Sequence, residues 1–265
     1  MRRQVATFLL LIAFCAGASA QIAEDLSQVK PAGCCLAGMA TRLSEQLQDW
    51  NQLGRYYKAN IELERKGTEP GRVVFMGDSI TDGWALDTSF PGKPYVNRGI
   101  GGQTTAQMLV RMYPDVIALQ PAAVIILAGT NDVSRNNGPQ TFEMIQQNIM
   151  AMTELATTHH IRIILSSLLP ITDAKMQSAA QGGGPIVQSQ HRPPADILKL
   201  NAWLKNYAAQ IGAGYADYYS ATVDEQGFLR APITEDGLHP NVGGYALMAP
   251  VAAASIEKAL RQKAH

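Results

Sequence analysis

Short apolar runs alternating with amphipathic segments limit most strongly how this chain can fold. Five runs of β-forming residues recur along it, and stretches with helical periodicity separate most of them. The pattern predicts strands at 72–76, 95–98, 122–127, 161–166 and 214–218, and helices from about residue 104, over 141–158, over 195–211 and from about residue 242. Strands separated by helices form a parallel sheet covered on both faces. We therefore expect residues 71–265 to form a three-layer α/β/α domain with a flavodoxin-like, doubly wound sheet of five parallel strands.

The first predicted strand ends in Gly77-Asp78-Ser79. Its apolar residues run on without alternation, as in a strand that is buried on both faces. Open α/β sheets bind ligands beyond the carboxyl ends of their strands, at the point where the strand order reverses. In the predicted order that point lies beside the first strand, so Ser79 is a candidate nucleophile.

A serine hydroxyl attacks well only when a base takes its proton and an acid orients that base. Asp236-Gly237-Leu238-His239-Pro240 contains both groups. In a turn, residues three apart can face each other, so the Asp236 carboxylate can accept the Nδ1 proton of His239 while Nε2 points outward. Pro240 suits the opening of the last helix.

The oxyanion of a tetrahedral intermediate needs donors from other strand ends. A glycine-rich turn at 97–104 offers backbone N–H groups that a ligand can approach closely, from Gly99, Gly101 or Gly102. Asn131 follows the apolar strand at 122–127 and offers a side-chain amide at a neighbouring strand end.

These stretches resemble the four sequence blocks of the SGNH (GDSL-type) esterase/lipase family, from about residue 72 to the end of the chain. The blocks are Gly77-Asp78-Ser79, the turn at Gly102, Gly129-Thr130-Asn131-Asp132 and Asp236-Gly237-Leu238-His239. The resemblance implies Ser79 as nucleophile, Asp236 as orienting acid and His239 as general base. It also implies an oxyanion hole made of the Ser79 N–H, the Gly102 N–H and the Asn131 side chain, with no cofactor and no metal.

Other polar and aromatic residues near these blocks have competing interpretations. Asp78 is expected to cap a turn, and Asp132 to be a buried hydrogen-bonding residue. Trp84 either packs in the core or lines the pocket. The biased segment at 173–194 follows a strand and is expected to overhang the site, so its His191 and Arg192 are candidate substrate contacts. The adjacent His159 and His160 are expected at a solvated helix end, where a metal site is the weaker alternative.

The start of the chain predicts export. Residues 1–20 contain Arg2-Arg3, an apolar middle and Ala18-Ser19-Ala20, which together are typical of a cleaved signal peptide. We expect a periplasmic or extracellular protein without a stable membrane anchor.

Residues 21–70 are predicted to form an N-terminal arm and an amphipathic helix over about 36–64, either continuous or broken at Gly54. The helix either covers the domain or contacts a partner chain, and packing on the domain is favoured. Cys34 and Cys35 could form a vicinal disulfide, an intermolecular bridge or no bond, and none of these is expected to be catalytic.

Charge argues against nucleic acid as a partner. Without residues 1–20 the chain keeps 20 of its 22 basic residues and all 22 acidic ones, a net charge of −2. The favoured function is a secreted serine esterase for short acyl, especially acetyl, esters of small molecules or carbohydrates. The alternatives are a lysophospholipase or thioesterase, a non-catalytic carbohydrate-binding protein, and a metal phosphoesterase, which the scarcity of histidines disfavours.

Overall fold

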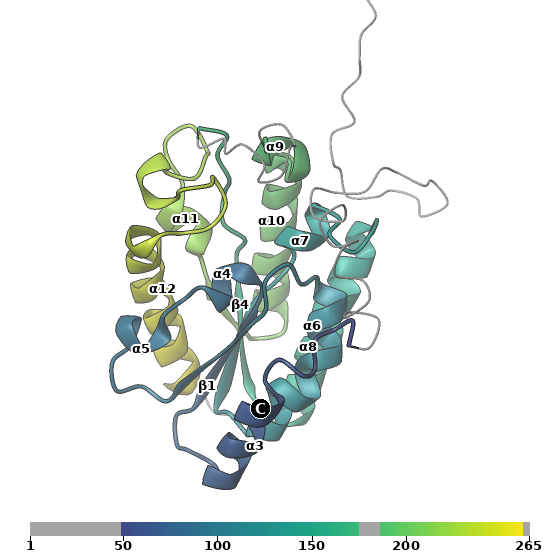
Figure 1. The fold of residues 1–265 in the computed structure, drawn as a ribbon, viewed down its shortest axis with the longest axis vertical. Helices are drawn as coiled ribbons and strands as arrows, with labels where there is room; N and C mark the ends of the chain where they lie inside the picture. The colour runs from purple at the N-terminus through teal and green to yellow at the C-terminus, as the bar shows by residue number, and fades with distance from the viewer. Residues whose placement is uncertain (1–48, 175–185, 262–265) are drawn as a thin grey trace, which may run out of the picture.

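A parallel five-stranded sheet forms the centre of the molecule (Figure 1). The computed structural model describes residues 49–174 and 186–261. The strand order is β2-β1-β3-β4-β5 and every pairing is parallel. The strands are β1 (Val73–Gly77), β2 (Tyr95–Gly99), β3 (Ala123–Leu127), β4 (Arg162–Ser166) and β5 (Gly214–Ala216). The predicted flavodoxin-like topology is thereby confirmed, with β1 between β2 and β3 at the reversal of strand order.

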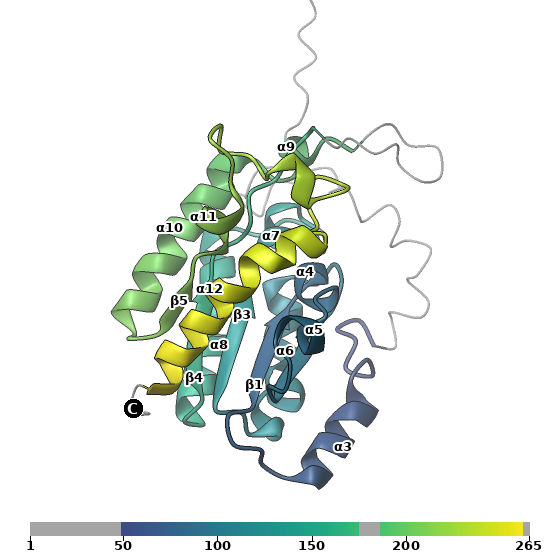
Figure 2. The same ribbon diagram turned by 90° about the vertical axis from the view of Figure 1, so that its left-hand side faces the viewer.

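Helices cover both faces of the sheet (Figures 1 and 2). One layer contains α6 (Thr105–Asp115), α8 (Phe142–Thr158) and α10 (Pro194–Gln210), and the other contains α5 (Leu86–Ser89) and α12 (Val242–Arg261). The short elements are α4 (Ser79–Asp82), η2 (Ile117–Leu119), α7 (Thr130–Val133), α9 (Gln188–His191), α11 (Tyr218–Thr222) and η3 (Ala231–Ile233). Figure 2 shows α12 running obliquely across the sheet.

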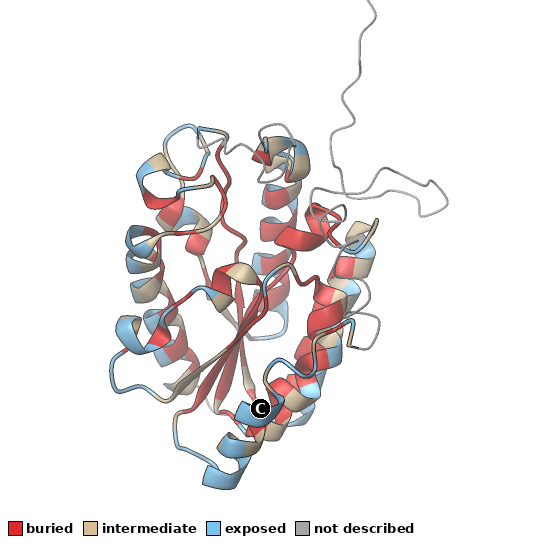
Figure 3. Ribbon diagram, viewed as in Figure 1, coloured by how far each residue is buried: buried red, intermediate tan, exposed pale blue. Residues whose placement is uncertain are grey.

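The central strands are buried on both faces because successive side chains point to opposite layers. Val74 and Met76 pack into the core shared with α6, α8 and α10, whereas Val73 and Phe75 pack into the core shared with α12. Figure 3 shows this burial as a red band along the strands. The uninterrupted apolar runs of the sequence correspond to this two-sided burial.

Local signals set most helix ends within a residue or two of the expected positions. Thr104 forms a capping box with Gln107 at the start of α6, and the Thr141 side chain accepts the Met144 N–H at the start of α8. β5 ends at Ala216, before the predicted residue 218, because the Asp217 side chain caps α11 by accepting the Ser220 N–H.

The described part of the chain begins at residue 49, within the amphipathic helix predicted over 36–64, and the helix observed there begins only at residue 57. There, helix α3 spans Tyr57–Lys66 and residues 49–56 form turns. The Asp49 carboxylate accepts the N–H groups of Leu53 and Gly54, which favours a tight turn over a continuous helix. The buried Asn60 side chain donates to Asp115 of α6, so α3 packs beside α6 at the end of the sheet opposite α4 (Figure 1).

Several predictions concern residues outside the described ranges. The expected signal segment 1–20, Cys34, Cys35 and the first part of the expected helix all lie before residue 49, and part of the expected overhanging loop lies at 175–185. Among the described residues, no helix combines the length and the apolar character needed to cross a membrane.

Candidate active site

Ser79 lies at the carboxyl end of β1, at the reversal of strand order. It is the first residue of α4, and the preceding Asp78 caps this turn by accepting the Ile80 N–H at 2.9 Å. Complete burial raises the pKa of Asp78 to about 6. The capping interpretation of Asp78 is thus confirmed, and the capped turn holds Ser79 directly beyond the end of β1.

A chain of two short hydrogen bonds links Ser79 to His239 and Asp236. Ser79 Oγ lies 2.8 Å from His239 Nε2, and His239 Nδ1 lies 2.5 Å from Asp236 Oδ2. With the Nδ1 proton held by the carboxylate, Nε2 presents a lone pair to the serine hydroxyl. This arrangement lets an imidazole take a hydroxyl proton.

The turn at 236–239 holds the acid and the base together. Asp236 Oδ1 accepts the N–H groups of Leu238 at 2.9 Å and His239 at 2.8 Å, which leaves Oδ2 for the imidazole. Gly237 has a φ of +81°, and a Cβ there would lie 2.0 Å from the Thr172 carbonyl oxygen. Only glycine combines this left-handed backbone with so close an approach.

Asp236 is well suited to remain ionised. Its partial burial opposes ionisation, but hydrogen bonds from the His239 side chain and backbone and from the Leu238 N–H outweigh that effect. The pKa of Asp236 therefore lies well below its usual value. A permanent negative charge beside His239 stabilises an imidazolium when one forms.

Two further strand ends place candidate oxyanion donors on the cavity that Ser79 lines. Gly102 has a φ of +79° in the turn after β2, and Asn131 lies in α7 after β3. The buried Asn131 amide donates through Nδ2 to the Gln103 carbonyl oxygen at 3.0 Å. Ser79, Gly102, Asn131, Asp236 and His239, which are far apart in the sequence, all line one cavity of about 300 Å³.

Of the three candidate substrate contacts, Arg192 lines this cavity, whereas His191 and Trp84 do not. The other lining residues are Asn136, Ile186, Gln188, Arg192 and Leu238. Arg192 is therefore in the site, whereas its neighbour His191 does not line the cavity.

The pocket interpretation of Trp84 is wrong. Its side chain is only 3% exposed, stacks on Tyr245 and meets Phe75 and Tyr218 edge to face. The apolar core of the α12 layer holds the ring away from the cavity.

Sequence reasoning missed Asn136 and Gln188. The Asn136 Nδ2 donates to Asn131 Oδ1 at 2.9 Å and to the Gly102 carbonyl oxygen at 3.1 Å. Gln188 Nε2 donates to the Asp236 carbonyl oxygen at 3.2 Å. Asn136 lies only five residues after Asn131, so the polar run behind β3 was the available signal. Nothing local in the sequence marks Gln188.

Asp132 is a buried structural acid, as expected. Its carboxylate accepts the backbone N–H and the hydroxyl of Thr105, which ties α7 to the start of α6. Burial raises the pKa of Asp132 to about 6. Asp132 therefore supports the segment that carries Asn131 and does not line the cavity.

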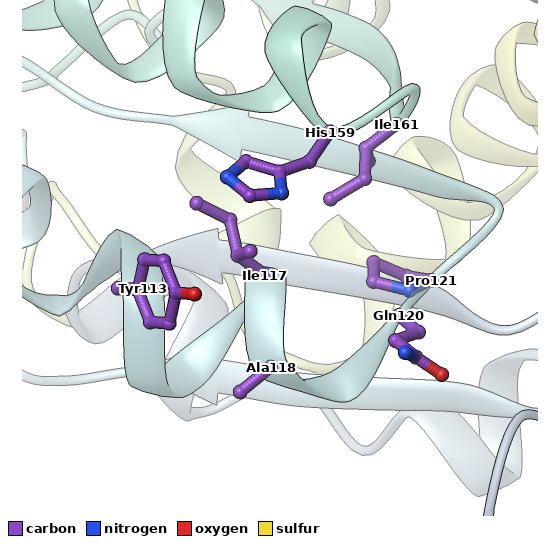
Figure 4. A pocket seen from close by; sticks show the side chains of 7 residues that line it. All are labelled: Tyr113, Ile117, Ala118, Gln120, Pro121, His159 and Ile161. Atoms are coloured by element: carbon purple, nitrogen blue, oxygen red, sulfur yellow. The ribbon is translucent and has the colours of Figure 1, made fainter.

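A second cavity, of about 420 Å³, lies beside η2, between the end of α6 and the segment that leads into β4 (Figure 4). It is lined by Tyr113, Ile117, Ala118, Gln120, Pro121, His159 and Ile161. His159 makes an edge-to-face contact with Tyr113 there. Within residues 49–174 and 186–261, no group of three or more His, Cys, Asp or Glu side chains is arranged to hold a metal ion.

Comparisons with known proteins agree with this geometry. A solved Bacteroides fragilis protein, described as a candidate acylhydrolase, is 41% identical, with a TM-score of 0.71 over 80% of this chain and 99% of that one. A GDSL-like lipase from Bacteroides thetaiotaomicron is 36% identical, with a TM-score of 0.69 over 80% of this chain and all of the other.

An acetylxylan esterase from Xylanibacter ruminicola is 25% identical over 222 residues, which are 70% of this chain and 43% of that protein. This chain spans about half the length of the curated relatives it matches.

The model of the GDSL-like lipase/acylhydrolase family matches residues 75–247. That range is more than half of the chain, and it contains all four blocks on which the resemblance to the SGNH (GDSL-type) family was based. The protein therefore belongs to the GDSL-like lipase/acylhydrolase family.

Proposed function

We propose that this protein hydrolyses carboxylic esters with Ser79 as nucleophile, His239 as general base and acid, and Asp236 as the group that orients His239. The observation that carries the proposal is the continuous hydrogen-bonded chain from Ser79 Oγ to His239 Nε2 and from His239 Nδ1 to Asp236. Membership of an acylhydrolase family supports it.

In this mechanism, Ser79 Oγ attacks the ester carbonyl carbon while its proton moves to His239 Nε2. The carbonyl oxygen becomes an oxyanion that accepts hydrogen bonds from the Ser79 N–H, the Gly102 N–H and Asn131 Nδ2. The intermediate collapses, and His239 returns the proton to the departing alcohol. Water then attacks the acyl-enzyme by the same steps, which releases the carboxylic acid and restores Ser79.

The cavity favours a short acyl group, and we propose acetyl esters, including those of carbohydrates, as substrates. At about 300 Å³ the cavity is small for a ligand pocket, and Ile186 and Leu238 are the only aliphatic side chains among its lining residues within the described part of the chain, so it has little room for a long acyl chain. The similarity to an acetylxylan esterase supports the same substrate class.

The Ser79→Ala variant tests the chemistry. Hydrolysis of 4-nitrophenyl acetate should fall by at least about 10³-fold, because removing one member of a triad disables the unit. Ser255→Ala is a matched control, because Ser255 of α12 donates to the Tyr215 carbonyl oxygen of β5, away from the cavity, and its loss should leave turnover unchanged. Turnover near that of the unaltered protein in Ser79→Ala would refute the mechanism.

An acyl-length series tests the substrate class. The kcat/KM for 4-nitrophenyl esters should be highest for acetate and fall steadily by octanoate, and acetylated xylo-oligosaccharides should release acetate. A preference for long chains or for lysophospholipids would favour the lipolytic alternative. Sugar binding without release of acetate would favour the non-catalytic alternative.

We also propose that residues 1–20 direct export. The support is the charged, apolar and small-residue order of that segment, and expression in a bacterial host provides the test. The exported protein should have the mass of a chain beginning at Gln21. A full-length protein retained in the cytoplasm would contradict this.

A further inference from the structure

We propose that Arg192 is a positioning residue of the oxyanion hole: through Asn131 it fixes the amide that receives the oxyanion and places a positive charge behind it. The inference rests on the proposed esterase function and extends it to a residue outside the triad and its three donors. It is carried by a set of hydrogen bonds around the Asn131 side chain.

The hydrogen-bond partners of Asn131 determine which way its amide points. Its Oδ1 accepts from Asn136 Nδ2 at 2.9 Å and from Arg192 Nη2 at 3.3 Å, so both acceptor sites of the oxygen are occupied. One Nδ2 proton goes to the Gln103 carbonyl oxygen. The other Nδ2 proton remains for the cavity. A flipped amide would turn its oxygen toward the Gln103 carbonyl and its NH₂ toward two donors.

Asn136 ties this amide to the other strand end. Its Nδ2 also donates to the Gly102 carbonyl oxygen at 3.1 Å, and its Oδ1 accepts the Ser134 hydroxyl at 2.7 Å. Gly102 and Asn131 are thereby held by one side chain. Arg192 donates to the same Asn131 Oδ1 atom as Asn136 does, but its donor group carries a positive charge.

Arg192 is a buried cation that interacts with the Asp78 carboxyl group only beyond ion-pair distance. It is 2% exposed, and its guanidinium donates to two neutral oxygens, Asn131 Oδ1 and Gln188 Oε1. Among residues 49–174 and 186–261 no carboxylate forms an ion pair with it. The buried Arg111 of α6, by contrast, is paired with Asp115. Burying a charge without an ion pair is costly. Arg72 is buried in the same way on backbone carbonyls, so what distinguishes Arg192 is its place on the cavity wall and its hydrogen bond to Asn131.

The position of the charge suits a negative charge that appears during the reaction. Arg192 lines the cavity together with Ser79 and Asn131. A charged donor on the amide oxygen polarises the amide and strengthens its N–H donor. Because the surroundings are buried, the field of the guanidinium is weakly screened there. The second Arg192 contact, Gln188, also donates to the Asp236 carbonyl, so α9 is fixed against the triad turn.

A double-mutant cycle tests the coupling between Arg192 and Asn131. The kcat and KM for 4-nitrophenyl acetate are measured in the unaltered protein, Arg192→Met, Asn131→Ala and the double variant. We expect Arg192→Met to lower kcat about 10-fold with KM nearly unchanged, less than the loss of on the order of 10²-fold for removal of Asn131 itself. In the Asn131→Ala background, Arg192→Met should lower kcat less than about 2-fold.

A control separates the loss of any buried arginine from the loss of this one. Arg72 is 2% exposed and lies just before β1, where it donates to the backbone carbonyls of Gly67 and of Leu119 in η2. Arg72→Met should reduce the melting temperature and leave kcat unchanged. If Arg192→Met does not fold, Arg192→Lys, which keeps a cation without the planar fork, takes its place in the same cycle.

The outcomes distinguish this inference from the proposed function. An equal loss of kcat in both backgrounds, a kcat equal to that of the unaltered protein in the Arg192 variant, or an effect on KM confined to anionic esters such as a succinate monoester would overturn the role assigned to Arg192. All three results leave esterase activity standing. Full activity in Ser79→Ala would instead remove the proposed function.

Discussion

Replacing Asp236 by asparagine exchanges one carboxylate oxygen for an NH₂ group and should nearly abolish activity. In the native turn, Asp236 Oδ1 accepts two backbone N–H groups and Oδ2 accepts the Nδ1 proton of His239. An asparagine has only one oxygen for these two positions. If the oxygen keeps the backbone N–H groups, its NH₂ faces Nδ1 and forces the proton of His239 onto Nε2, where it can no longer take the Ser79 proton.

The opposite amide orientation is disfavoured. It would restore the correct tautomer of His239 but would turn an NH₂ toward the N–H groups of Leu238 and His239. Losing two hydrogen bonds costs about 2–3 kcal/mol, which is about a 30- to 150-fold reduction in the population of the productive form. The variant also lacks the negative charge that stabilises the imidazolium. We expect a combined kcat loss of on the order of 10⁴-fold, as for the equivalent change in other serine triads.

The measurement is the kcat for 4-nitrophenyl acetate at neutral pH, with Asp217→Asn as the matched control. Asp217 holds a similar local turn, with Oδ1 on the Ser220 N–H and Oδ2 on the Ser220 hydroxyl, but lies outside the cavity. Its variant should keep full turnover. An Asp236→Asn variant within 10-fold of the unaltered protein would refute the tautomer argument.

The stability of Asp236→Asn provides a second readout. Because the pKa of Asp236 is lowered by folding, its carboxylate stabilises the native state above its unfolded pKa of about 3.8, and that contribution is lost as the pH falls further. The variant should therefore be less stable than the unaltered protein at pH 7, and the difference should shrink below about pH 4. A difference independent of pH would contradict the assignment of the depressed pKa to this group.

Two further predictions follow from the turn at Gly237 and from the buried acid beside Ser79. Gly237→Ala should lower both the melting temperature and kcat, by more than about 10-fold for kcat, because a Cβ would lie 2.0 Å from the Thr172 carbonyl oxygen and displace the turn. Gly227→Ala is the control, because φ there is +90° and no atom lies within 4 Å of the added Cβ; it should cost only about 1 kcal/mol of stability and no activity. Equal effects of the two substitutions would contradict the clash predicted between the Cβ added at position 237 and the Thr172 carbonyl oxygen. Asp78 is protonated in the native state up to about pH 6 but only to about 3.8 when unfolded, so its contribution to stability is complete below about pH 4 and is lost as the pH rises through about 6. Asp78→Asn should flatten the decline in unfolding free energy over that range by about 3 kcal/mol, measured by urea unfolding, and an unchanged decline would refute the raised pKa.

Much of the architecture is readable from the sequence because it depends on local patterns. Parallel strands buried on both faces require uninterrupted apolar runs, and Val73–Met76 and Ala123–Leu127 are such runs. Capping residues such as Thr104 and Thr141 mark where helices start. The four polar blocks follow strand ends or precede the last helix, so the parallel topology alone brings them to one edge.

The amphipathic pattern before residue 57 gave a wrong result in the described residues 49–56. Apolar spacing predicts a helix wherever it recurs, but Asp49 forms side-chain hydrogen bonds to Leu53 and Gly54 that hold the backbone in a turn. Trp50 and Leu53 are 52% and 39% exposed, so burial of these two apolar side chains contributes little to a helical stretch there. The sequence also left open whether Trp84 packs in the core or lines the pocket. Its aromatic neighbours Phe75, Tyr218 and Tyr245 lie on three separate elements, so no local pattern reveals that they surround it.

The sequence by itself determined the strand order, the placement of Ser79 beyond β1 and the pairing of Asp236 with His239 within one turn. Only the tertiary structure decided which side chains stand behind the oxyanion donors. Asn136 is local to Asn131, but Arg192 meets it across 61 residues and Gln188 meets Asp236 across 48. Hydrogen bonds act over about 3 Å and depend on direction, so a sequence pattern that fixes an element to within a residue or two cannot fix such contacts.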